Sequence, residues 1–525
     1  MEPSCVRQDQ IPGTSALLVD YLYQFPKLSA FFPYSSWYID SIASAAASVS
    51  FPAARRAQLV AALAAQNDDT TALNKLAQPN TVVIVTGQQV GFLLGPAYTI
   101  FKALTAVKIA EHLAAQGISA VPIFWLATED HDLAEVDHAW VFNQDATPSK
   151  LSLAGSIVNG GPVGDVILNE IPLAELRAAL GDLPFADDVV KQVAASYQPG
   201  ATLGSAFRKL LKQTLQGLGL LYLDPLAAPV REIGAPFLSD AVQRVPEILS
   251  ALRARNTEIS KAGYHTQVHV DDDASLFFLL KNGRRLPVRY KDGRFSTREA
   301  TYTAAELAAM AAQLSPNALL RPVWADYMLP SAGNVAGPAE IAYLAQSSAL
   351  YHSLLGRMPV IYPRNGFTLL DARAAKLLDR YSLHVPDLLE HHENVKGVIA
   401  ARLVPPALTQ QLKAAENSAS ESLAQLQSGL LNFDPTLEAA ARKSIAKITY
   451  QFAKLERKIA RETMRRDERA SKDAHYLLNL IYPQRHLQER FYSILPFLAK
   501  HGLDFPRQLL SQVQLGCSDH MLRAF

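Results

Sequence analysis

The chain has 525 residues, of which 49% are hydrophobic, so it can form a large core with inserted or appended parts. Its 50 Lys and Arg residues nearly balance 49 Asp and Glu residues, and the net charge of +1 argues against a nucleic-acid-binding protein. Two cysteines are too few for a disulfide framework. The sequence shows no basic-then-apolar N-terminal segment and no apolar run near the ~20 residues of a membrane span, so we expect a cytoplasmic protein.

A β-α-β unit is predicted within residues 76–145. Residues 82–85 form a β-branched apolar run that is typical of a buried parallel strand. Residues 98–115 follow with the apolar spacing of a helix, and residues 121–127 form a second apolar run. A third strand is predicted at residues 139–142. The pattern indicates an α/β fold, in which ligands bind at the carboxyl ends of the strands.

The rest of the chain is predicted to hold insertions and a helical appendage. Short apolar runs and turns such as Asn159-Gly160-Gly161 indicate an inserted subdomain. From about residue 405, apolar residues recur every three or four positions in two runs separated by Asp434-Pro435, which predicts an antiparallel helical hairpin or coiled coil. The expected segments are an N-terminal helical segment packed on the core (1–75), the first part of the core (76–145), inserted subdomains with a return to the core near 218–224 (146–316), the second part of the core (317–390), the coiled-coil hairpin (391–480) and a C-terminal segment (481–525).

A polar, glycine-rich loop follows the first predicted strand. It reads Thr86-Gly87-Gln88-Gln89-Val90-Gly91, with Gly95 and Tyr98 leading into the helix. The loop matches neither the Walker pattern nor the dinucleotide fingerprint. Glycines nevertheless let a ligand approach the backbone closely, a following helix N-terminus favours anions, and adjacent glutamines offer both donors and acceptors. We expect a ligand-binding loop, with an unusual strand-to-helix connection as the alternative.

A cluster of ionisable residues, Glu129-Asp130-His131-Asp132, ends the second predicted strand. One carboxylate can orient the imidazole while another faces a substrate amine or water, so Asp130, His131 and Asp132 are candidate catalytic residues. The spacing, even with Asp137 and His138 nearby, matches no zinc pattern, and we predict no metal. Helix caps and ion pairs remain the structural alternative.

Isolated ionisable residues occur among apolar residues later in the chain. Arg321, Glu340 and Arg364 could form satisfied buried ion pairs, or the two arginines could bind a carboxylate or phosphate in bidentate geometry. Near the C-terminus, Arg485 and the Glu489-Arg490 pair could be surface charges or could hold phosphates.

Five stretches resemble the bacillithiol-biosynthesis cysteine-adding enzyme family, BshC. They are TGQQVG…GPAYT (residues 86–99), WLATEDHD (125–132), RP…LP…GPAEIAYLAQ (321–346), MPVIYPR (358–364) and RHLQERF (485–491). They occur in family order and span most of the chain.

The resemblance implies a Rossmann-like core similar to class I aminoacyl-tRNA synthetases and nucleotidylyltransferases, with inserted connecting-peptide subdomains and a C-terminal α-helical coiled coil that forms a homodimer. It implies an ATP-dependent bacterial ligase that joins the carboxylate of cysteine to the amine of glucosaminyl-malate. Candidate substrate-binding residues in the matching stretches are Thr86, Gly87, Gln88, Gln89, Gly91, Gly95, Tyr98, Trp125, Glu129, Arg321, Glu340 and Arg364. Candidate nucleotide-binding residues are Arg485, His486, Glu489 and Arg490.

Two other functions stay open at this stage. A basic second helix in the hairpin could bind nucleic acid, although interleaved acidic residues and the near-neutral net charge argue against it. The coiled coil could instead make the chain a non-catalytic partner that assembles other thiol-biosynthesis enzymes.

Overall fold

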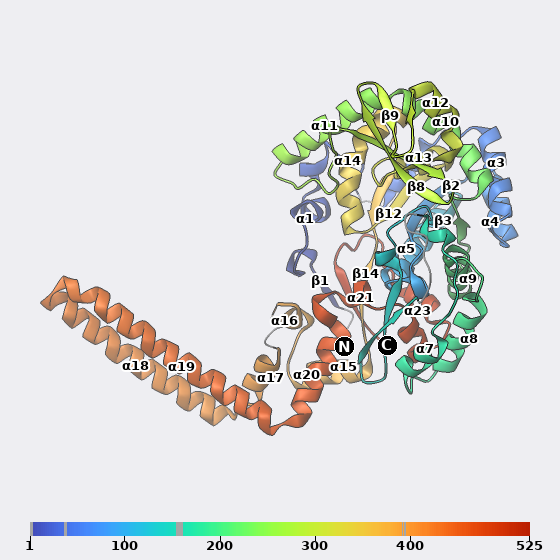
Figure 1. Ribbon diagram of the computed structural model, residues 1–525. Coiled ribbons are helices and arrows are strands. Elements are labelled where there is room, and N and C mark those ends of the chain that lie inside the picture. Colours follow the sequence, from blue (N-terminus) through green and yellow to red (C-terminus); the bar gives the residue numbers. More distant parts are fainter. Residues whose placement is uncertain (1–3, 36–38, 154–160, 391, 393–394) are drawn as a thin grey trace. The chain divides into compact units, whose positions relative to one another are not determined.

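The computed structural model describes residues 4–35, 39–153, 161–390, 392 and 395–525 (Figure 1). Residues 159 and 160 of the predicted glycine turn lie outside these ranges. The chain divides into two compact units. The core unit comprises residues 2–368 and 488–523, and the hairpin unit comprises residues 369–487 with residues 1 and 524–525. The chain thus leaves the core unit at residue 369, earlier than the boundary expected at residue 390.

The core unit is built on a parallel sheet in the order β13-β12-β2-β3-β6. Its strands are β2 (Val82–Gln89), β3 (Ala120–Ala127), β6 (Leu221–Leu223), β12 (Ser331–Ala336) and β13 (Val360–Pro363). From β2 the chain first winds outward through β3 and β6, and then returns to the other side of β2 with β12 and β13. This doubly wound order confirms the α/β, Rossmann-like fold and places its switch point between β2 and β12.

Both faces of the sheet are buried, as the continuous apolar runs predict. On β2, Val83 and Val85 pack into one apolar cluster, and Val82 and Ile84 pack into a second cluster. Helix α5 (Tyr98–Ala115) packs in the second cluster, and α14 (Pro338–Leu355) packs in the first. The two crossover helices therefore cover opposite faces of the sheet (Figure 1).

The predicted third strand forms, but it does not join the parallel sheet. Strand β4 (His138–Phe142) pairs antiparallel with β5 (Pro148–Ser152) in a separate two-stranded sheet. The strand that pairs with β3 at the edge of the parallel sheet is β6, which follows an inserted helical segment. That segment contains α6 (Leu133–Val136), α7 (Leu173–Leu180), α8 (Ala186–Ser196) and α9 (Leu203–Thr214).

A second insertion separates β6 from β12. It holds an antiparallel sheet in the order β10-β9-β8-β7-β11. Its strands are β7 (Ala274–Lys281), β8 (Arg284–Lys291), β9 (Arg294–Ser296), β10 (Thr301–Tyr302) and β11 (Leu314–Pro316). Its helices are α10 (Ala228–Gln243), α11 (Val245–Lys261), α12 (Ala304–Ala309) and α13 (Arg321–Met328).

The two ends of the chain complete the core unit. Strand β1 (Ser4–Val6) pairs antiparallel with β15 (His520–Ala524). The N-terminal helices are α1 (Ala16–Tyr23), α2 (Asp40–Ala47), α3 (Ala53–Ala64) and α4 (Thr70–Ala77). The C-terminal helices are α21 (Gln488–Phe491), α22 (Leu495–His501) and α23 (Phe505–Gln512). Strand β14 (Gly366–Leu370) runs across the sequence boundary between the units.

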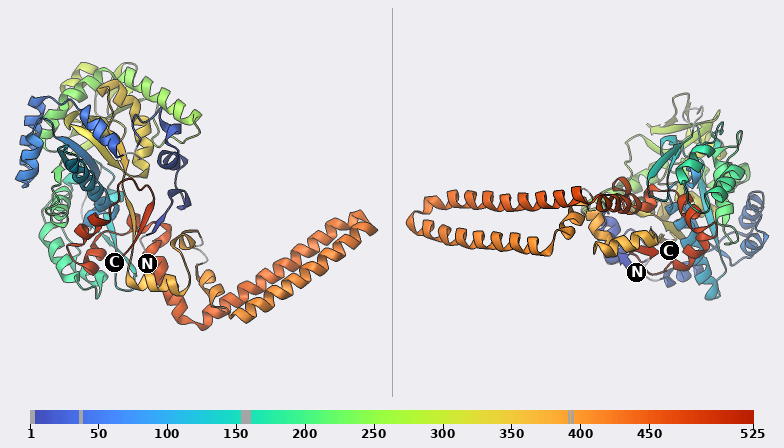
Figure 2. Two further views of the ribbon diagram at one scale, coloured as in Figure 1. Left: turned by 180° about the vertical axis from the view of Figure 1, so that it is seen from behind. Right: turned by 90° about the horizontal axis from the view of Figure 1, so that it is seen from below.

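The hairpin unit is helical. Two long antiparallel helices, α18 (Pro406–Phe433) and α19 (Glu438–Arg466), run side by side in both views of Figure 2, as the heptad spacing predicts. The remaining helices of the unit are α15 (Ala372–Arg380), α16 (Val385–Glu390), α17 (Val395–Leu403) and α20 (Glu468–Ile481). Among the described residues, no helix combines the length and apolar character that a membrane span requires.

Candidate functional site

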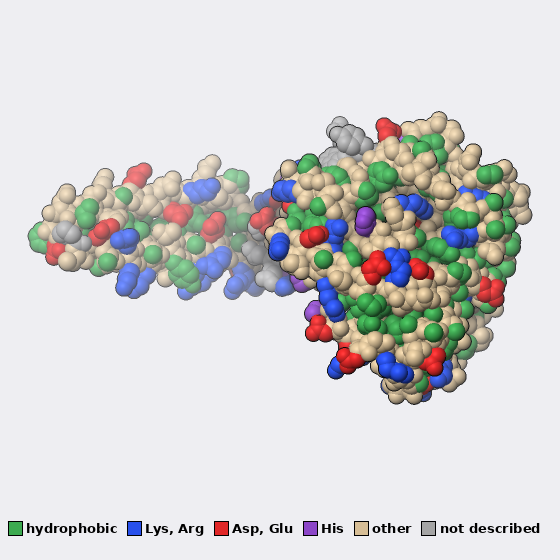
Figure 3. All heavy atoms as spheres, turned by 90° about the horizontal axis from the view of Figure 1, so that it is seen from above, with side chains coloured by type: hydrophobic (Ala, Val, Ile, Leu, Met, Phe, Trp, Pro, Cys, Tyr) green, Lys and Arg blue, Asp and Glu red, His purple; other side chains and the backbone are tan. Residues whose placement is uncertain are grey.

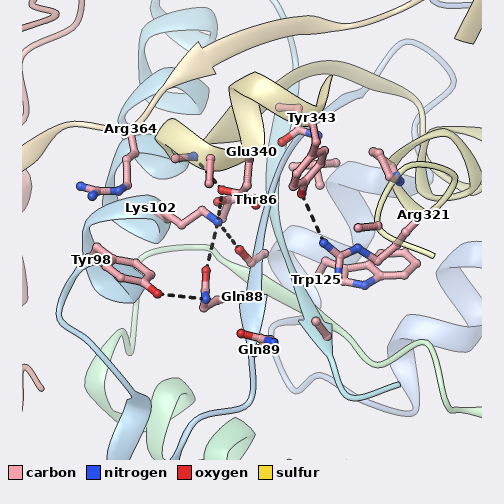
Figure 4. Close-up of a pocket in the computed structure, with 18 of the residues that line it drawn as sticks. Thr86, Gln88, Gln89, Tyr98, Lys102, Trp125, Arg321, Glu340, Tyr343 and Arg364 are labelled. Carbon is pink, nitrogen blue, oxygen red and sulfur yellow. Dashed lines mark hydrogen bonds and ion pairs between the residues drawn. The ribbon is translucent and has the colours of Figure 1, made fainter. Parts of the chain in front are cut away.

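A pocket of about 440 Å³ opens at the switch point of the parallel sheet (Figure 4). The carboxyl ends of β2 and β12 form its floor, and residues from α5, α13 and α14 form its walls. Its charged lining residues are the cations Lys102, Arg321, Arg364 and Arg490 and the anions Asp130, Glu135 and Glu340. Both the place and the mixed charge are those of a site for a polar small molecule.

Lys102 is the central buried cation of the pocket, and sequence reasoning missed it. Its Nζ lies 2.6 Å from Glu340 Oε2, and it donates to Gly87 O at 2.5 Å and to Gln88 Oε1 at 3.2 Å (Figure 4). Burial lowers the pKa of Lys102, while Glu340 opposes that shift. With three acceptors for its three protons, Lys102 ties the carboxyl end of β2 to the start of α14.

Glu340 has a second partner that explains its position. Its Oε2 accepts a hydrogen bond from Gly337 N at 2.6 Å, in the capping arrangement at the N-terminus of α14. The carboxylate therefore neutralises both the buried Lys102 and the helix N-terminus. Its main role in the unliganded pocket is structural.

Arg321 and Trp125 form one end of the pocket (Figure 4). Arg321 begins α13, and its Nη2 donates to Tyr343 Oη at 3.3 Å, the single hydrogen bond from its side chain within the described part of the chain. Burial alone would lower the pKa of Arg321, but the effects of the neighbouring Tyr343 and Glu340 are larger, and its pKa is raised. The Trp125 indole is 4% exposed, and its Nε1–H has no hydrogen-bond partner among the described residues. Arg321 and Trp125 thus each keep N–H donors without a partner among the described residues.

Arg364 already holds a carboxylate. Its Nη1 and Nη2 donate to Glu489 Oε2 and Oε1 at 2.9 and 2.5 Å, and Glu489 also accepts from Phe367 N at 2.8 Å. Burial would raise the pKa of Glu489, but Arg364 and the other donors lower it. Arg364 therefore forms a buried ion pair, which was one of the two predicted alternatives. Its two terminal nitrogens bind Glu489, so they do not form the expected bidentate contact with a substrate. Glu489, which the sequence placed in a nucleotide site, is this pair's anion.

Tyr98 and Arg490 line the pocket together with Arg364. The Tyr98 hydroxyl accepts from Gln88 Nε2 at 3.3 Å, and the Arg364 guanidinium lies 5.2 Å from the Tyr98 ring centroid. Arg490 is exposed and lines the pocket. Its expected neighbours Arg485 and His486 belong to the hairpin unit and are not among the lining residues, so the predicted nucleotide-binding group does not form one cluster in the core unit.

Two carboxylates of the pocket share one amide group. Gln89 Nε2 donates to Asp130 Oδ2 at 2.8 Å and to Glu135 Oε2 at 2.9 Å. Asp130 is partly buried, which would raise its pKa, but Gln89, Arg285 and the backbone N–H of His131 outweigh burial and lower it. Asp130 is therefore ionised at neutral pH. Glu135 was not anticipated from the sequence, because it lies beyond the EDHD cluster.

The other members of the EDHD cluster lie outside the pocket. His131 Nδ1 meets Arg285 Nη1 at 2.9 Å, and since arginine can only donate, this ring nitrogen accepts. A ring nitrogen held by Arg285 in this way is not available to take a proton from a substrate. Asp132 is exposed and precedes α6. Glu129 is buried against Arg231 Nη1 at 2.6 Å, and its pKa is raised by burial.

The predicted polar loop is only partly a loop, because residues 86–89 extend strand β2 and pair with β3, and the chain turns only after Gln89. Thr86, Gly87, Gln88 and Gln89 line the pocket, whereas the Gly91–Gly95 turn does not. A Cβ on Gly91 would lie 3.0 Å from Gly95 Cα, and Gly95 has φ of +59°. Close packing and a left-handed backbone therefore explain this glycine pair. Within the described ranges, no group of three or more His, Cys, Asp or Glu side chains is arranged to hold a metal ion.

Comparison with known families covers both units. Residues 1–365 match the family model described as bacillithiol biosynthesis BshC, N-terminal Rossmann-like domain, and residues 367–522 match bacillithiol biosynthesis BshC, C-terminal coiled-coil domain. The chain is 49% identical over 520 residues to a protein of Solibacter usitatus, covering 99% of each chain. It is 34% identical over 530 residues to one from Koribacter versatilis, again covering 99% of each, and 26% identical over 449 residues to one from Bacillus cereus, covering 82% of each. Each relative is named "Putative cysteine ligase BshC".

Proposed function

Because this chain belongs to the bacillithiol-biosynthesis BshC family, we propose that it is a ligase that acts in the pocket described above. Its substrates are cysteine and glucosaminyl-malate, and the reaction joins the cysteine carboxyl group to the amine of the amino sugar as an amide. ATP is consumed, because amide formation from a free carboxylate in water needs an activated carboxyl group.

The observation that carries this proposal is the presence of unused donors and of carboxylates in one cavity. Cysteine and glucosaminyl-malate each contain carboxylate and amine groups. A pocket for them therefore needs sites for anions and for amines, and the sheet switch point supplies both.

We assign carboxylate binding to Arg321 and Trp125. Arg321 keeps most of its five N–H donors free in the described structure, and guanidinium geometry matches a carboxylate. The unpartnered indole N–H of Trp125 gains a hydrogen bond when a carboxylate or hydroxyl oxygen is bound beside it. Arg364 supports this site by position and charge rather than by bidentate contact, because Glu489 occupies its terminal nitrogens.

We assign amine binding to Asp130 and Glu135. The Gln89 amide nitrogen between them already marks a point where one nitrogen donor meets two carboxylates. An ammonium group near this point would be held by opposite charge, and attack requires that it lose a proton. The lowered pKa makes Asp130 a weak base, so its proposed role is to orient the amine and accept its hydrogen bond. His131 acts, in this proposal, only through Asp130.

The pocket fits carboxylates better than a triphosphate. Of the four lining cations, Lys102 and Arg364 are paired with Glu340 and Glu489, and Glu340 already caps the N-terminus of α14. Helix N-termini and unpaired cations are the usual phosphate ligands. We therefore propose that ATP activates the cysteine carboxyl group, and we assign none of these pocket residues to ATP binding.

The test is a reaction of the purified full chain with cysteine, glucosaminyl-malate and ATP, followed by mass spectrometry. We expect the cysteinyl amide together with AMP, as an acyl-adenylate gives, or with ADP, as an acyl-phosphate gives. An Arg284→Ala variant, changed at an exposed site away from the pocket, is the activity control. Absence of amide from protein that demonstrably binds the acceptor would refute catalysis by this chain alone and favour the assembly function.

The hairpin gives no support to nucleic-acid binding. Several of its arginines are paired with acidic residues on the same helix, including Arg442 with Glu438 and both Arg465 and Arg466 with Glu462. Figure 3 shows acidic, basic and hydrophobic side chains mixed along this surface. These ion pairs reduce the positive charge that phosphate backbones would meet and argue against such binding.

We propose instead that the hairpin forms a homodimer. Large apolar side chains stand exposed along α18 and α19, including Leu426, Leu431, Ile448 and Leu455. Exposed apolar groups in series are typical of an association surface. Sedimentation equilibrium should give a dimer for the native chain and a monomer for a Leu426→Glu, Ile448→Glu variant, and a native monomer at micromolar concentration would contradict the proposal.

A further inference from the structure

One arginine of the inserted antiparallel sheet reaches the edge of the pocket. Arg285 is the second residue of β8, just after the turn at Asn282-Gly283, and its side chain is 8% exposed. Arginine side chains are rarely buried to this extent unless other groups satisfy their charge and their donors. The partners of Arg285 therefore indicate its role.

The guanidinium of Arg285 is fixed by two other strands of the inserted sheet. Its Nε donates to Ser315 Oγ at 3.1 Å, and its Nη2 donates to Pro316 O at 3.0 Å, both on β11. On β7, the centroid of the Phe278 ring lies 3.8 Å from Arg285 Cζ. Because the guanidinium is planar and rigid, these contacts also fix the direction of its remaining nitrogen, Nη1.

That nitrogen meets the segment that follows β3. Arg285 Nη1 lies 2.9 Å from His131 Nδ1 and 4.0 Å from Asp130 Oδ1. The same Asp130 oxygen accepts the backbone N–H of His131 at 2.7 Å, while Asp130 Oδ2 accepts from Gln89 Nε2 at 2.8 Å. The Asp130 carboxylate is thus held by the inserted sheet through one oxygen and by the end of β2 through the other.

The charges at this contact stabilise each other. Burial lowers the pKa of Arg285, while the carboxylates of Glu129 and Asp130 oppose that shift. Glu129 is already paired with Arg231 at 2.6 Å. Asp130, in contrast, forms no ion pair with a lysine or a second arginine among the described residues. Arg285 is therefore the cation that accompanies the Asp130 carboxylate.

We propose that Arg285 is a positioning residue, through which the inserted sheet holds the Asp130 carboxylate in the orientation that receives the acceptor amine. This inference rests on the proposed function, but the hold of Arg285 on Asp130 can be measured without any reaction. Lysine cannot replace Arg285, because a single ammonium group does not reproduce the directions of three nitrogens. Since Nη1 also approaches Asp130 directly, loss of Arg285 should have a larger effect than loss of His131.

The first measurement is hydrogen–deuterium exchange of the unliganded full chain, read by mass spectrometry of its peptides. In Arg285→Ala and in Arg285→Lys, we expect the peptides that cover residues 128–137 to exchange at least about fivefold faster than in the native chain. The reason is that the hydrogen bonds accepted by Asp130 open more often when its carboxylate is not held. Exchange in α14 should stay unchanged, which would show that the fold is intact.

Arg289 provides the matched control on the same strand. It is paired with Asp273 at 2.6 Å, but its side chain is 57% exposed. Arg289→Ala also removes a cation and an ion pair from β8, so it should leave the exchange of residues 128–137 at the native rate.

The second measurement is the initial rate of amide formation. Arg285→Ala should lower kcat about tenfold and change the KM for the acceptor less than about threefold, because a misplaced carboxylate disturbs orientation more than binding. In an Asp130→Asn background the same substitution should have no further effect, because Arg285 acts through Asp130. A side chain needed only for folding would lower activity by the same factor in both backgrounds.

The two measurements separate this inference from the proposed function. A native chain that forms no amide would refute the ligase function, while faster exchange in Arg285→Ala and not in Arg289→Ala would still support the hold on Asp130. The inference is overturned if residues 128–137 exchange alike in these two variants, or if the kinetic loss persists when Asp130 is already asparagine.

Discussion

Replacing Lys102 with methionine tests whether its ion pair with Glu340 holds the pocket together. Loss of one partner from a buried pair typically costs about 3–5 kcal/mol, because the other charge stays desolvated. Here the Glu340 side chain is 27% exposed toward the pocket and keeps its hydrogen bond from Gly337 N, so water relieves part of that cost. We expect Lys102→Met to lower the free energy of unfolding by about 2–3 kcal/mol.

The assay is urea unfolding followed by tryptophan fluorescence. The chain has 4 tryptophans, at positions 37, 125, 140 and 324, so the signal reports on the core unit alone. Adding Glu340→Gln removes the stranded charge, and we expect the double variant to be more stable than additivity predicts by roughly 1–2 kcal/mol.

Lys108 supplies a matched control on the same helix. Its ion pair with Glu111 is 3.6 Å long and the two side chains are 34% and 52% exposed, so Lys108→Met should change stability by less than about 0.5 kcal/mol. Equal small effects of the two lysine variants, or strict additivity of Lys102→Met with Glu340→Gln, would refute the argument that the buried pair organises the pocket.

Three further predictions concern the pocket and the buried histidine. Arg321→Gln should raise the KM for the acceptor about tenfold or more with little change in unfolding, as initial-rate kinetics will show, whereas Arg284→Ala should leave KM unchanged. Asp130→Asn should lower kcat/KM by about 10²-fold and His131→Ala by less than about threefold; a large His131 effect would restore its role as a base. Burial lowers the pKa of His520 below its usual 6.5, so the unfolded chain gains a proton first and stability falls as pH drops below 6.5. This loss of unfolding free energy is at most about 1.4 kcal/mol per pH unit, and it should be absent from His520→Asn. Urea unfolding measured between pH 7 and pH 5 will show it. If stability falls with pH as steeply in the variant as in the native chain, the burial of a neutral ring is contradicted.

The fold could be predicted where the signal is local. The apolar runs at residues 82–85 and 121–127, with a helix between them, specify a β-α-β unit because only buried parallel strands accept unbroken β-branched sequence. Strand β4 shows where this reasoning stops. Its own residues do not say which strand it pairs with, and in the structure it pairs with β5 across a short connection.

The site could be predicted as a place but only partly as a set of residues. The predicted strand order put residues 86–91 and the EDHD cluster at one edge of the sheet, and Gln88 and Gln89 at the end of β2 and Asp130 after β3 do line the pocket. The ion pair of Arg364 with Glu489 spans 125 residues of sequence, so no local pattern reveals that the arginine is already occupied. Lys102 was missed because one lysine in a helix normally extends into solvent. Its burial on every side follows from α5 being enclosed by the sheet and the C-terminal helices.

The sequence arrangement of the two units has a consequence for synthesis on the ribosome. The hairpin unit is encoded between the two parts of the core unit, and the Phe367 to Glu489 hydrogen bond of 2.8 Å joins the chain just before it to the chain just after it. A nascent chain therefore exposes Arg364 long before its carboxylate partner has been translated. The pocket wall stays electrostatically incomplete until the last few dozen residues emerge, so the core unit matures late, after the hairpin helices have had time to form.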